Sequence, residues 1–203
     1  MKISITGHKS GIGLSIYQKL SEDPNNQITG WDILDGWDIA DDLVQKKIIE
    51  DLDNQDVFIN NAYCYLAQTR LLEEAIRQWE NKEKIIINIG AAMTQATNES
   101  IYRMEIVFQN QLLAYAADKD VQNSICKNRL GLSRPRIQNV LVDFAKTSLA
   151  DSCDLNGGIP TDSIAEQIVN SMPQLNNPAY LSLLMISDSY GQRNIFEKNY
   201  ARS

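Results

Sequence analysis

Histidine and cysteine are scarce in this chain. The single histidine is His8, and the three cysteines, Cys64, Cys126 and Cys153, are widely spaced with no C-x-x-C pair. Zinc sites and disulfide frameworks are built from clusters of these residues, so the sequence predicts neither. A Ser-His-Asp or Cys-His catalytic arrangement would have to use His8, which lies in a glycine-rich loop, and we do not expect one.

Basic residues and long apolar runs are also lacking. The chain has 19 lysines and arginines against 26 acidic residues, a net charge of -7, which repels nucleic acid. No apolar run is long enough to span a bilayer, and the first residues lead into a predicted strand instead of an export signal. We therefore expect a cytoplasmic protein with no nucleic-acid or membrane partner.

The 203 residues, 43% of them hydrophobic, are enough for one well-buried core, so we expect a single domain over residues 1–203. Strand-like apolar segments alternate with segments of helical periodicity, which is typical of an α/β fold with a doubly wound parallel sheet. The predicted strands are Met1–Ile5, Gln27–Trp31, a very short one before Asp38, Asp56–Asn61, Lys84–Ala92 with its exit turn, Arg136–Val142 and Tyr180–Ile186.

The stretch Thr6–Gly13 is rich in glycine and lies between the first predicted strand and a helix whose apolar face carries Ile12, Ile16 and Leu20. Glycines in this context permit a tight turn and let backbone N–H groups approach a pyrophosphate, which the helix N-terminus attracts. An ordinary turn is the alternative. The candidate cofactor-binding residues are Gly7, His8, Lys9, Ser10, Gly11, Ile12 and Gly13.

Asp32 ends the second predicted strand, about 20 residues after the glycine loop, where dinucleotide folds carry the acid that binds the adenosine ribose. Such an acid favours NAD over NADP because it repels a 2′-phosphate. Asp32 is equally well explained as the start of a turn with Asp35-Gly36. Lys9 would instead help a 2′-phosphate, so NAD is the preferred expectation and NADP stays open.

Two further motifs follow. The strand after Asp56 ends in Asn60-Asn61-Ala62, and a long predicted helix from Ile101 carries Tyr115 and Lys119, four residues apart and hence on one face. On such a face the lysine ammonium is expected to lower the pKa of the phenol.

The loop spacing G-x-x-x-G-x-G after threonine, the Asn-Asn-Ala strand end and the Y-x-x-x-K helix together resemble the short-chain dehydrogenase/reductase family over essentially the whole chain. The resemblance implies a Rossmann-like domain that binds NAD(P) and transfers a hydride between the nicotinamide and a small carbonyl or alcohol substrate. It also implies roles for single residues: Tyr115 as acid or base, Lys119 as its tuner and a nicotinamide-ribose ligand, Asp38 at the adenine, Asn60, Asn61 and Ala62 lining the cofactor, and Thr147 at the carboxamide.

The chain also departs from this family. Gly90, Ala91 and Ala92 stand where the family has its substrate-binding serine, and Tyr63 replaces a glycine. The family's asparagine is missing at residues 65–68, and Asp143-Phe144 replaces Pro-Gly. Losing one donor to a developing oxyanion removes roughly a hundred- to thousandfold in rate, so a catalytically impaired dinucleotide-binding sensor or interaction protein is the alternative function.

Association of copies is a further expectation. The amphipathic helices around residues 66–80 and 101–118 resemble those that form a four-helix interface in family dimers. We therefore expect a homodimer or homotetramer, although each helix is also explained by packing on its own sheet.

Overall fold

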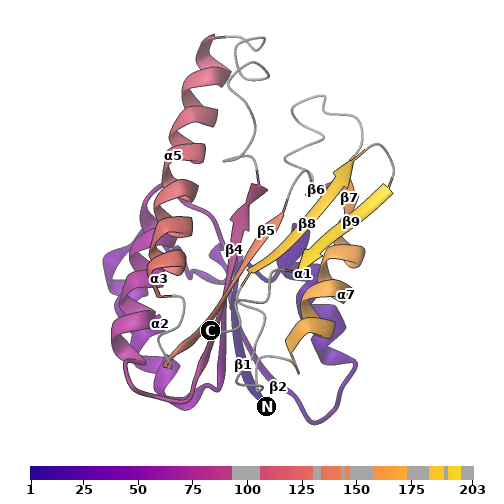
Figure 1. Ribbon diagram of the computed structural model, residues 1–203. Coiled ribbons are helices and arrows are strands. Elements are labelled where there is room, and N and C mark those ends of the chain that lie inside the picture. Colours follow the sequence, from indigo (N-terminus) through magenta and orange to yellow (C-terminus); the bar gives the residue numbers. More distant parts are fainter. Residues whose placement is uncertain are drawn as a thin grey trace.

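The computed structural model describes residues 1–92, 106–129, 134–142, 145–146, 158–172, 183–189 and 192–197. Its centre is a seven-stranded sheet in the order β2-β1-β3-β4-β5-β8-β9 (Figure 1). The first six strands in this order are parallel, and β9 is antiparallel to β8. The strands are β1 (Lys2–Thr6), β2 (Gln27–Trp31), β3 (Val57–Asn60), β4 (Ile85–Ala91), β5 (Arg136–Val142), β8 (Leu183–Ser189) and β9 (Gln192–Glu197), with a small separate pair of β6 (Ala145–Lys146) and β7 (Ile159–Pro160).

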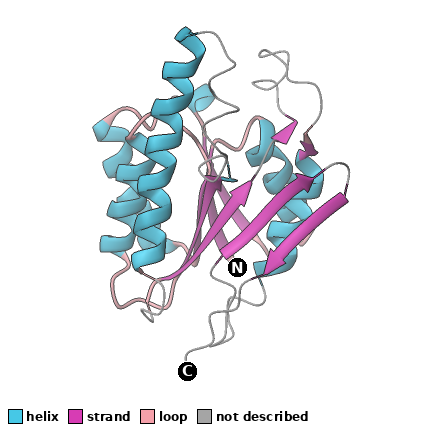
Figure 2. Ribbon diagram, turned by 45° about the horizontal axis from the view of Figure 1, so that its top comes forward, coloured by secondary structure: helices cyan, strands magenta, loops and turns pink. Residues whose placement is uncertain are grey.

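Helices cover both faces of this sheet, which confirms the predicted doubly wound α/β fold (Figure 1 and Figure 2). One face carries α1 (Gly11–Ser21) and α7 (Thr161–Ser171), and the other carries α2 (Asp42–Asp51), α3 (Ala67–Gln78) and α5 (Ile106–Asn128). Two 3-10 turns, η1 (Ile33–Asp35) and η2 (Leu52–Asn54), flank α2. Within the described ranges, no helix combines the length and the apolar character needed to cross a membrane.

Alternate residues of the central strands pack into two cores. Ile3, Ile5 and Ile87 pack with α1 and α7, whereas Phe58 and Ile86 pack with α3, and all five side chains are 0% exposed. Strands covered on both faces have no solvent side, which is why β3 and β4 are nearly continuous apolar runs. Each fully buried side chain of this kind contributes roughly 2 kcal/mol to stability.

The expected short strand before Asp38 is wrong. After β2 the chain turns through η1, where the Asp32 side chain accepts the Leu34 N–H at 3.0 Å and the Asp32 carbonyl accepts the Trp37 N–H at 3.0 Å. Gly36 closes the turn with a φ of 83°, a conformation that glycine adopts without cost. Because these backbone groups are satisfied within the turn, they need no partner strand.

The end of the sheet also differs from expectation. The last predicted strand, Tyr180–Ile186, corresponds to β8, and β9 then adds an antiparallel strand that the sequence did not predict. The β9 sequence QRNIFE is mostly polar. An edge strand of this kind carries little of the apolar periodicity by which strands are recognised.

Candidate active site

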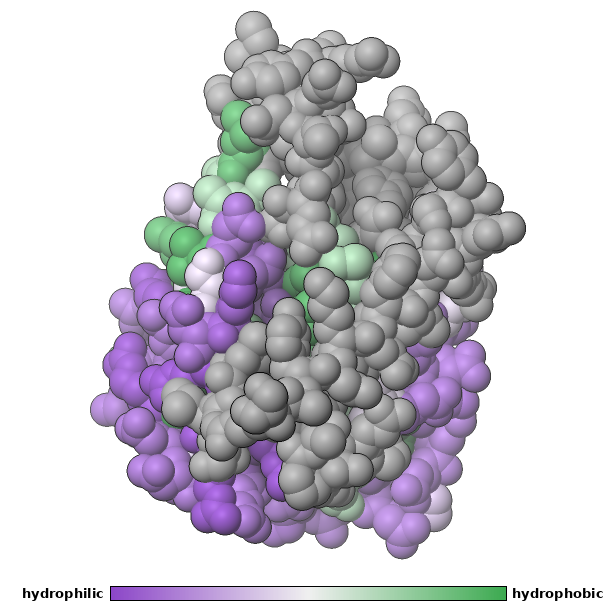
Figure 3. Space-filling model, viewed as in Figure 1, coloured by the Kyte–Doolittle hydropathy of each residue, from purple (hydrophilic) through white to green (hydrophobic). Residues whose placement is uncertain are grey.

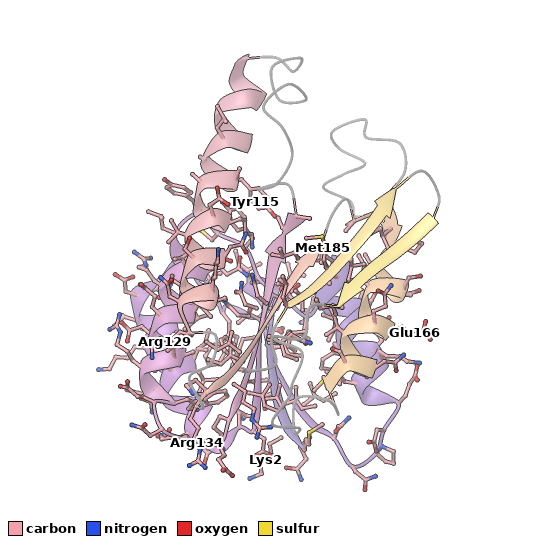
Figure 4. All side chains as sticks on the ribbon, in the orientation of Figure 1. Lys2, Tyr115, Arg129, Arg134, Glu166 and Met185 are labelled. Atoms are coloured by element: carbon pink, nitrogen blue, oxygen red, sulfur yellow. The ribbon has the colours of Figure 1, made fainter. Side chains whose placement is uncertain are left out.

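The predicted site residues gather at the carboxyl edge of the parallel strands. The glycine loop follows β1, Asp32 follows β2, Asn61 follows β3, and Tyr115 on α5 lies beside the end of β4 (Figure 4). Lys2 and Arg134 mark the opposite edge of the sheet in the same view. In open α/β sheets the ligand crevice lies outside the carboxyl ends of the strands.

The glycine loop has the geometry of a phosphate cradle. Gly7 has a φ of 69° and Gly11 a φ of 52°, which residues with a side chain rarely adopt. A Cβ on Gly13 would lie 1.9 Å from the Gly7 carbonyl oxygen, so only glycine lets α1 begin this close to the loop. Ser10 precedes α1 without capping it through its side chain, and an anion can take that place. The loop therefore fits the phosphates of a dinucleotide.

The end of β3 holds this loop. The Thr6 hydroxyl accepts the backbone N–H groups of Asn61 and Ala62, both at 3.0 Å. The Asn61 side-chain amide donates to the carbonyls of Thr6 at 3.0 Å and Gly7 at 3.2 Å. Asn61 and Ala62 thus fix the backbone of the cradle.

His8 packs inside the fold beside the cradle. A Cβ on Gly30 of β2 would lie 2.4 Å from the His8 ring, whose centroid is 5.1 Å from that of Tyr17 on α1. The His8 Nδ1 atom is buried and has no hydrogen-bond partner among the residues that the structure describes. The imidazole therefore fills the space between β2 and α1, and only glycine at position 30 leaves room for it.

Asp32 and Lys9, the two candidate selectors of the cofactor, contact each other. Asp32 is 5% exposed and accepts the backbone N–H of Lys9 at 2.9 Å. The Lys9 ammonium forms an ion pair with Asp35. Asp38 accepts the Ala40 N–H at 2.9 Å, within its own turn. The carboxylates of Asp32 and Asp35 thus border the cradle, and Lys9 is already paired.

Tyr115 and Lys119 lie one turn apart on α5, and Tyr63 packs against both. The two phenol rings meet edge to face with centroids 4.7 Å apart. Lys119 Nζ lies 5.6 Å from the Tyr115 centroid and 5.1 Å from that of Tyr63. Sequence reasoning noted Tyr63 only as a replaced glycine, although an aromatic residue directly after Asn-Asn-Ala is a signal that it lies at the same edge of the sheet.

Lys119 is buried, with 2% of its surface exposed. Its ammonium donates to Gln68 Oε1 at 2.5 Å, to the Ile89 carbonyl at 2.9 Å and to Gln122 Oε1 at 3.4 Å. Burial lowers the pKa of Lys119 to about 7. All three acceptors are neutral, and sequence reasoning missed both glutamines.

Tyr115 does not have the lowered pKa that the spacing of Tyr115 and Lys119 predicts. Burial, and after it the charge of Asp118, raise the pKa of Tyr115 to about 12. Burial likewise raises the pKa of Tyr63 to about 12. Because Lys119 is itself desolvated and turned toward neutral oxygens, it does not offset these effects.

A row of hydrogen-bonded amide side chains, here called the amide ladder, holds the acceptors of Lys119 in place. Asn60, Asn88 and Asn139 occupy the same register position on β3, β4 and β5. Asn60 donates to Asn88 at 3.0 Å, Asn88 to Asn139 at 3.0 Å, and Asn139 to Asn123 on α5 at 2.8 Å. Gln68 joins the ladder by donating to the Asn60 carbonyl at 2.8 Å. One asparagine at the same point of three successive strands was the available sequence signal.

Solved structures match this chain, whereas no protein-family model and no curated protein sequence does. A 3-alpha-hydroxysteroid dehydrogenase from a Pseudomonas species, complexed with NADH, gives a TM-score of 0.68 at 17% identity, over 91% of this chain and 94% of that chain. A short chain dehydrogenase from Burkholderia cenocepacia, in complex with NADP, gives 0.70 at 13% identity, over 91% and 86%. A serine dehydrogenase complexed with NADP+ gives 0.63 at 15% identity, over 98% and 100%.

The chain has the fold of the short-chain dehydrogenases/reductases. At these identities the similarity is one of fold, and it agrees with the resemblance found in the motifs.

Within this short-chain dehydrogenase/reductase fold, the end of β4 carries no hydroxyl. A Cβ on Gly90 would lie 2.9 Å from Leu141 Cδ2 and 3.2 Å from Asn123 Oδ1, so a serine at that position would have to displace the ends of these two side chains. Ala91 is buried, 4% exposed. Thr147, the predicted carboxamide ligand, lies outside the described residues. The hydroxyl groups that the structure places beside Lys119 are therefore the phenols of Tyr115 and Tyr63.

A Gly13→Ala variant tests the cradle. The added methyl group forces α1 away from Gly7, so we expect NADH affinity to fall at least tenfold, or about 1.4 kcal/mol. Binding is measured by energy transfer from tryptophan to the nicotinamide, with calorimetry as a check. Gly36→Ala is the control, because a Cβ at Gly36 meets nothing within 4 Å and the variant strains only its own turn, at a φ of 83°. Equal affinities in the two variants would contradict the assignment.

Proposed function

We propose that this protein is an NAD(P)-dependent oxidoreductase that transfers a hydride between a nicotinamide and a small carbonyl or alcohol. The observation that carries the proposal is the position of Tyr115 and Lys119 at the same sheet edge as the Gly7–Gly13 cradle. Hydride transfer needs a phosphate-binding site and an acid–base pair close together, and here both lie at one edge of the sheet. The NADH and NADP complexes of proteins with the same fold support it.

In this proposal the cradle, Asp32, Asn61 and Ala62 hold the dinucleotide, whose nicotinamide supplies or accepts the hydride. Tyr115 gives its proton to the carbonyl oxygen during reduction. Lys119 holds the ribose after its ammonium turns from the inward acceptors. Since the end of β4 has no hydroxyl to bind the carbonyl, the enzyme is expected to be slower by roughly a hundred- to thousandfold than one with that donor.

The alternative is a dinucleotide-binding sensor or interaction protein without turnover. The missing hydroxyl at residues 90–92 and the inward hydrogen bonds of Lys119 favour it. The two functions differ in one measurable respect, since both require the cofactor but only one converts a substrate.

The Tyr115→Phe variant distinguishes the oxidoreductase from the sensor. Removing the phenol proton should lower turnover of the best carbonyl substrate by at least about a hundredfold while NADH affinity stays within about twofold of the original, because the ring contact with Tyr63 is kept. Tyr65→Phe, at a position 56% exposed, is the control. Unchanged turnover in Tyr115→Phe would sink the oxidoreductase proposal, and tight NADH binding with no reduction across a carbonyl panel would favour the sensor.

We infer that NAD is preferred over NADP. Asp32 and Asp35 put two carboxylates beside the cradle, and the Lys9–Asp35 ion pair occupies the one cation of the loop. A 2′-phosphate would meet negative charge there with no unpaired lysine to balance it.

Asp35→Asn should therefore reduce the preference for NAD over NADP. Freeing Lys9 and removing one negative charge is expected to strengthen NADPH binding about tenfold with little change for NADH. Asp23→Asn, an equal charge change at the far end of α1, should leave both affinities unchanged. If Asp35→Asn and Asp23→Asn have the same NADPH affinity, Asp35 does not determine the cofactor preference.

We also propose that copies associate through α5, as a homodimer or homotetramer. Leu113 and Val121 are each 48% exposed and lie two turns apart on one helix face, and hydrophobic residues reach the surface on this side of the molecule (Figure 3). Apolar residues at the same place on two copies can cover one another across a two-fold axis.

Sedimentation at micromolar concentration tests the interface. We expect an assembly larger than the monomer, and Leu113→Glu should shift it to monomer because a carboxylate would be buried there. Leu43→Glu changes another exposed leucine, on α2, and serves as the control. A native protein that sediments only as monomer would remove the proposal.

We further propose a cytoplasmic setting. Cys64 and Cys126 form no disulfide within the described residues, and burial raises the pKa of the Cys126 thiol to about 12, which keeps it unreactive. Unpaired thiols of this kind suit a reducing compartment.

A further inference from the structure

Tyr63 carries a hydroxyl group that the reaction as described above does not use. It follows Ala62 directly after the end of β3, at the same edge of the sheet as Tyr115, and is 41% exposed. Within the part of the chain that the structure describes, no residue forms a hydrogen bond with this hydroxyl. The group is therefore available to a ligand.

The loop that carries Tyr63 is held at both ends. At its start the Thr6 hydroxyl accepts the backbone N–H of Ala62 at 3.0 Å. At its end the Asp118 carboxylate on α5 accepts the Leu66 N–H at 3.1 Å, and Asp118 is 2% exposed, so this bond is shielded from water. Tyr63 is thus a fixed part of this edge of the sheet. Donors that are held in place before the reaction are the ones that stabilise a transition state most.

The Tyr63 ring packs against the predicted acid–base pair. It meets the Tyr115 ring edge to face, at 74° with centroids 4.7 Å apart, and its own centroid lies 5.1 Å from Lys119 Nζ. Burial raises the pKa of Tyr63 to about 12, so the hydroxyl keeps its proton at neutral pH and can donate it to a hydrogen bond.

The substrate oxygen needs a second donor. Hydride addition puts negative charge on a carbonyl oxygen, which has two lone pairs and accepts two hydrogen bonds. Tyr115 satisfies one of these. Residues 90–92 at the end of β4, with the sequence Gly-Ala-Ala, have no hydroxyl for the other. Tyr63 brings such a hydroxyl into contact with Tyr115 from a different strand end.

We propose that Tyr63 is a catalytic residue whose hydroxyl donates a hydrogen bond to the substrate carbonyl oxygen, in place of a hydroxyl from β4; this rests on the proposed oxidoreductase function. During reduction the carbonyl carbon gains the hydride of the reduced dinucleotide, and the carbonyl oxygen gains the Tyr115 proton. The Tyr115 phenolate then regains a proton from water. Tyr63 forms and breaks no covalent bond, and it stabilises the charge on the oxygen during the transfer.

This donor compensates for the one that β4 lacks. The loss of rate expected from the missing β4 hydroxyl, roughly a hundred- to thousandfold, then appears only when the Tyr63 hydroxyl is removed as well.

Tyr63→Phe removes the hydroxyl and keeps the ring that packs on Tyr115. We expect kcat and kcat/KM for reduction of the best carbonyl substrate to fall alike by roughly a hundred- to thousandfold, because the hydrogen bond strengthens as charge develops on the oxygen. NADH affinity should stay within about twofold of the original. Tyr65→Phe, which removes the hydroxyl of a ring that is 56% exposed two residues further on, is the control and should change neither quantity.

A second readout needs no turnover. The amide analogue of the best substrate has a carbonyl oxygen that accepts hydrogen bonds but is not reduced, and calorimetry measures its binding to the protein–NADH complex. Tyr63→Phe should weaken this binding roughly threefold to tenfold, the effect of one lost hydrogen bond. Tyr65→Phe should leave it unchanged.

Equal turnover in Tyr63→Phe and Tyr65→Phe would overturn the role of Tyr63 and leave the oxidoreductase proposal standing. A loss of NADH affinity as large as the loss of turnover would also overturn it, because the hydroxyl would then act on the cofactor. If Tyr115→Phe leaves turnover unchanged, or the native protein reduces no carbonyl, the oxidoreductase proposal fails and the role of Tyr63 fails with it.

Discussion

The buried ammonium of Lys119 is the constraint on which most of this site depends. An ammonium removed from water needs an acceptor for every donor, and here these are two glutamine side chains and the Ile89 carbonyl. Gln68 is held in turn by the backbone of Asn60, which begins the amide ladder through Asn88 and Asn139. The ladder is thus the inner support of the lysine, and it spans the three central strands.

This support has an electrostatic consequence. Neutral acceptors satisfy the hydrogen bonds of Lys119 but do not compensate its charge, so desolvation lowers its pKa. The carboxylate nearest to it in sequence, Asp118, is directed instead to the N-terminus of α3. Burial and the charge of Asp118 both raise the pKa of Tyr115, whereas for Lys119 the charge of Asp118 partly offsets the effect of burial.

The cradle and the surroundings of Tyr115 depend on different kinds of interaction. The cradle consists of backbone, and its requirements are steric: space at Gly13 and positive φ at Gly7 and Gly11. The part around Tyr115 consists of side chains from α5, from α3 and the loop before it, and from β4, and their pKa values depend on burial and on neighbouring charges. The presence of Tyr63 in place of a small residue affects only the surroundings of Tyr115 and Lys119, because the Tyr63 ring contacts both.

The sequence by itself determined the fold class, the parallel strands and the cradle, because apolar periodicity and glycine spacing are local signals. Only the tertiary structure decided what surrounds Tyr115. The Y-x-x-x-K spacing brings a lysine near a phenol, but the pKa of each depends on burial and on partners more than 25 residues away in sequence, such as Gln68 and Ile89. The turn after Asp32 and the polar edge strand β9 were likewise decided by hydrogen bonds that composition does not reveal. The pKa values of Tyr115 and Lys119 and the pairing of β9 depend on which residues are close in space, and the spacing of residues in the sequence does not identify them.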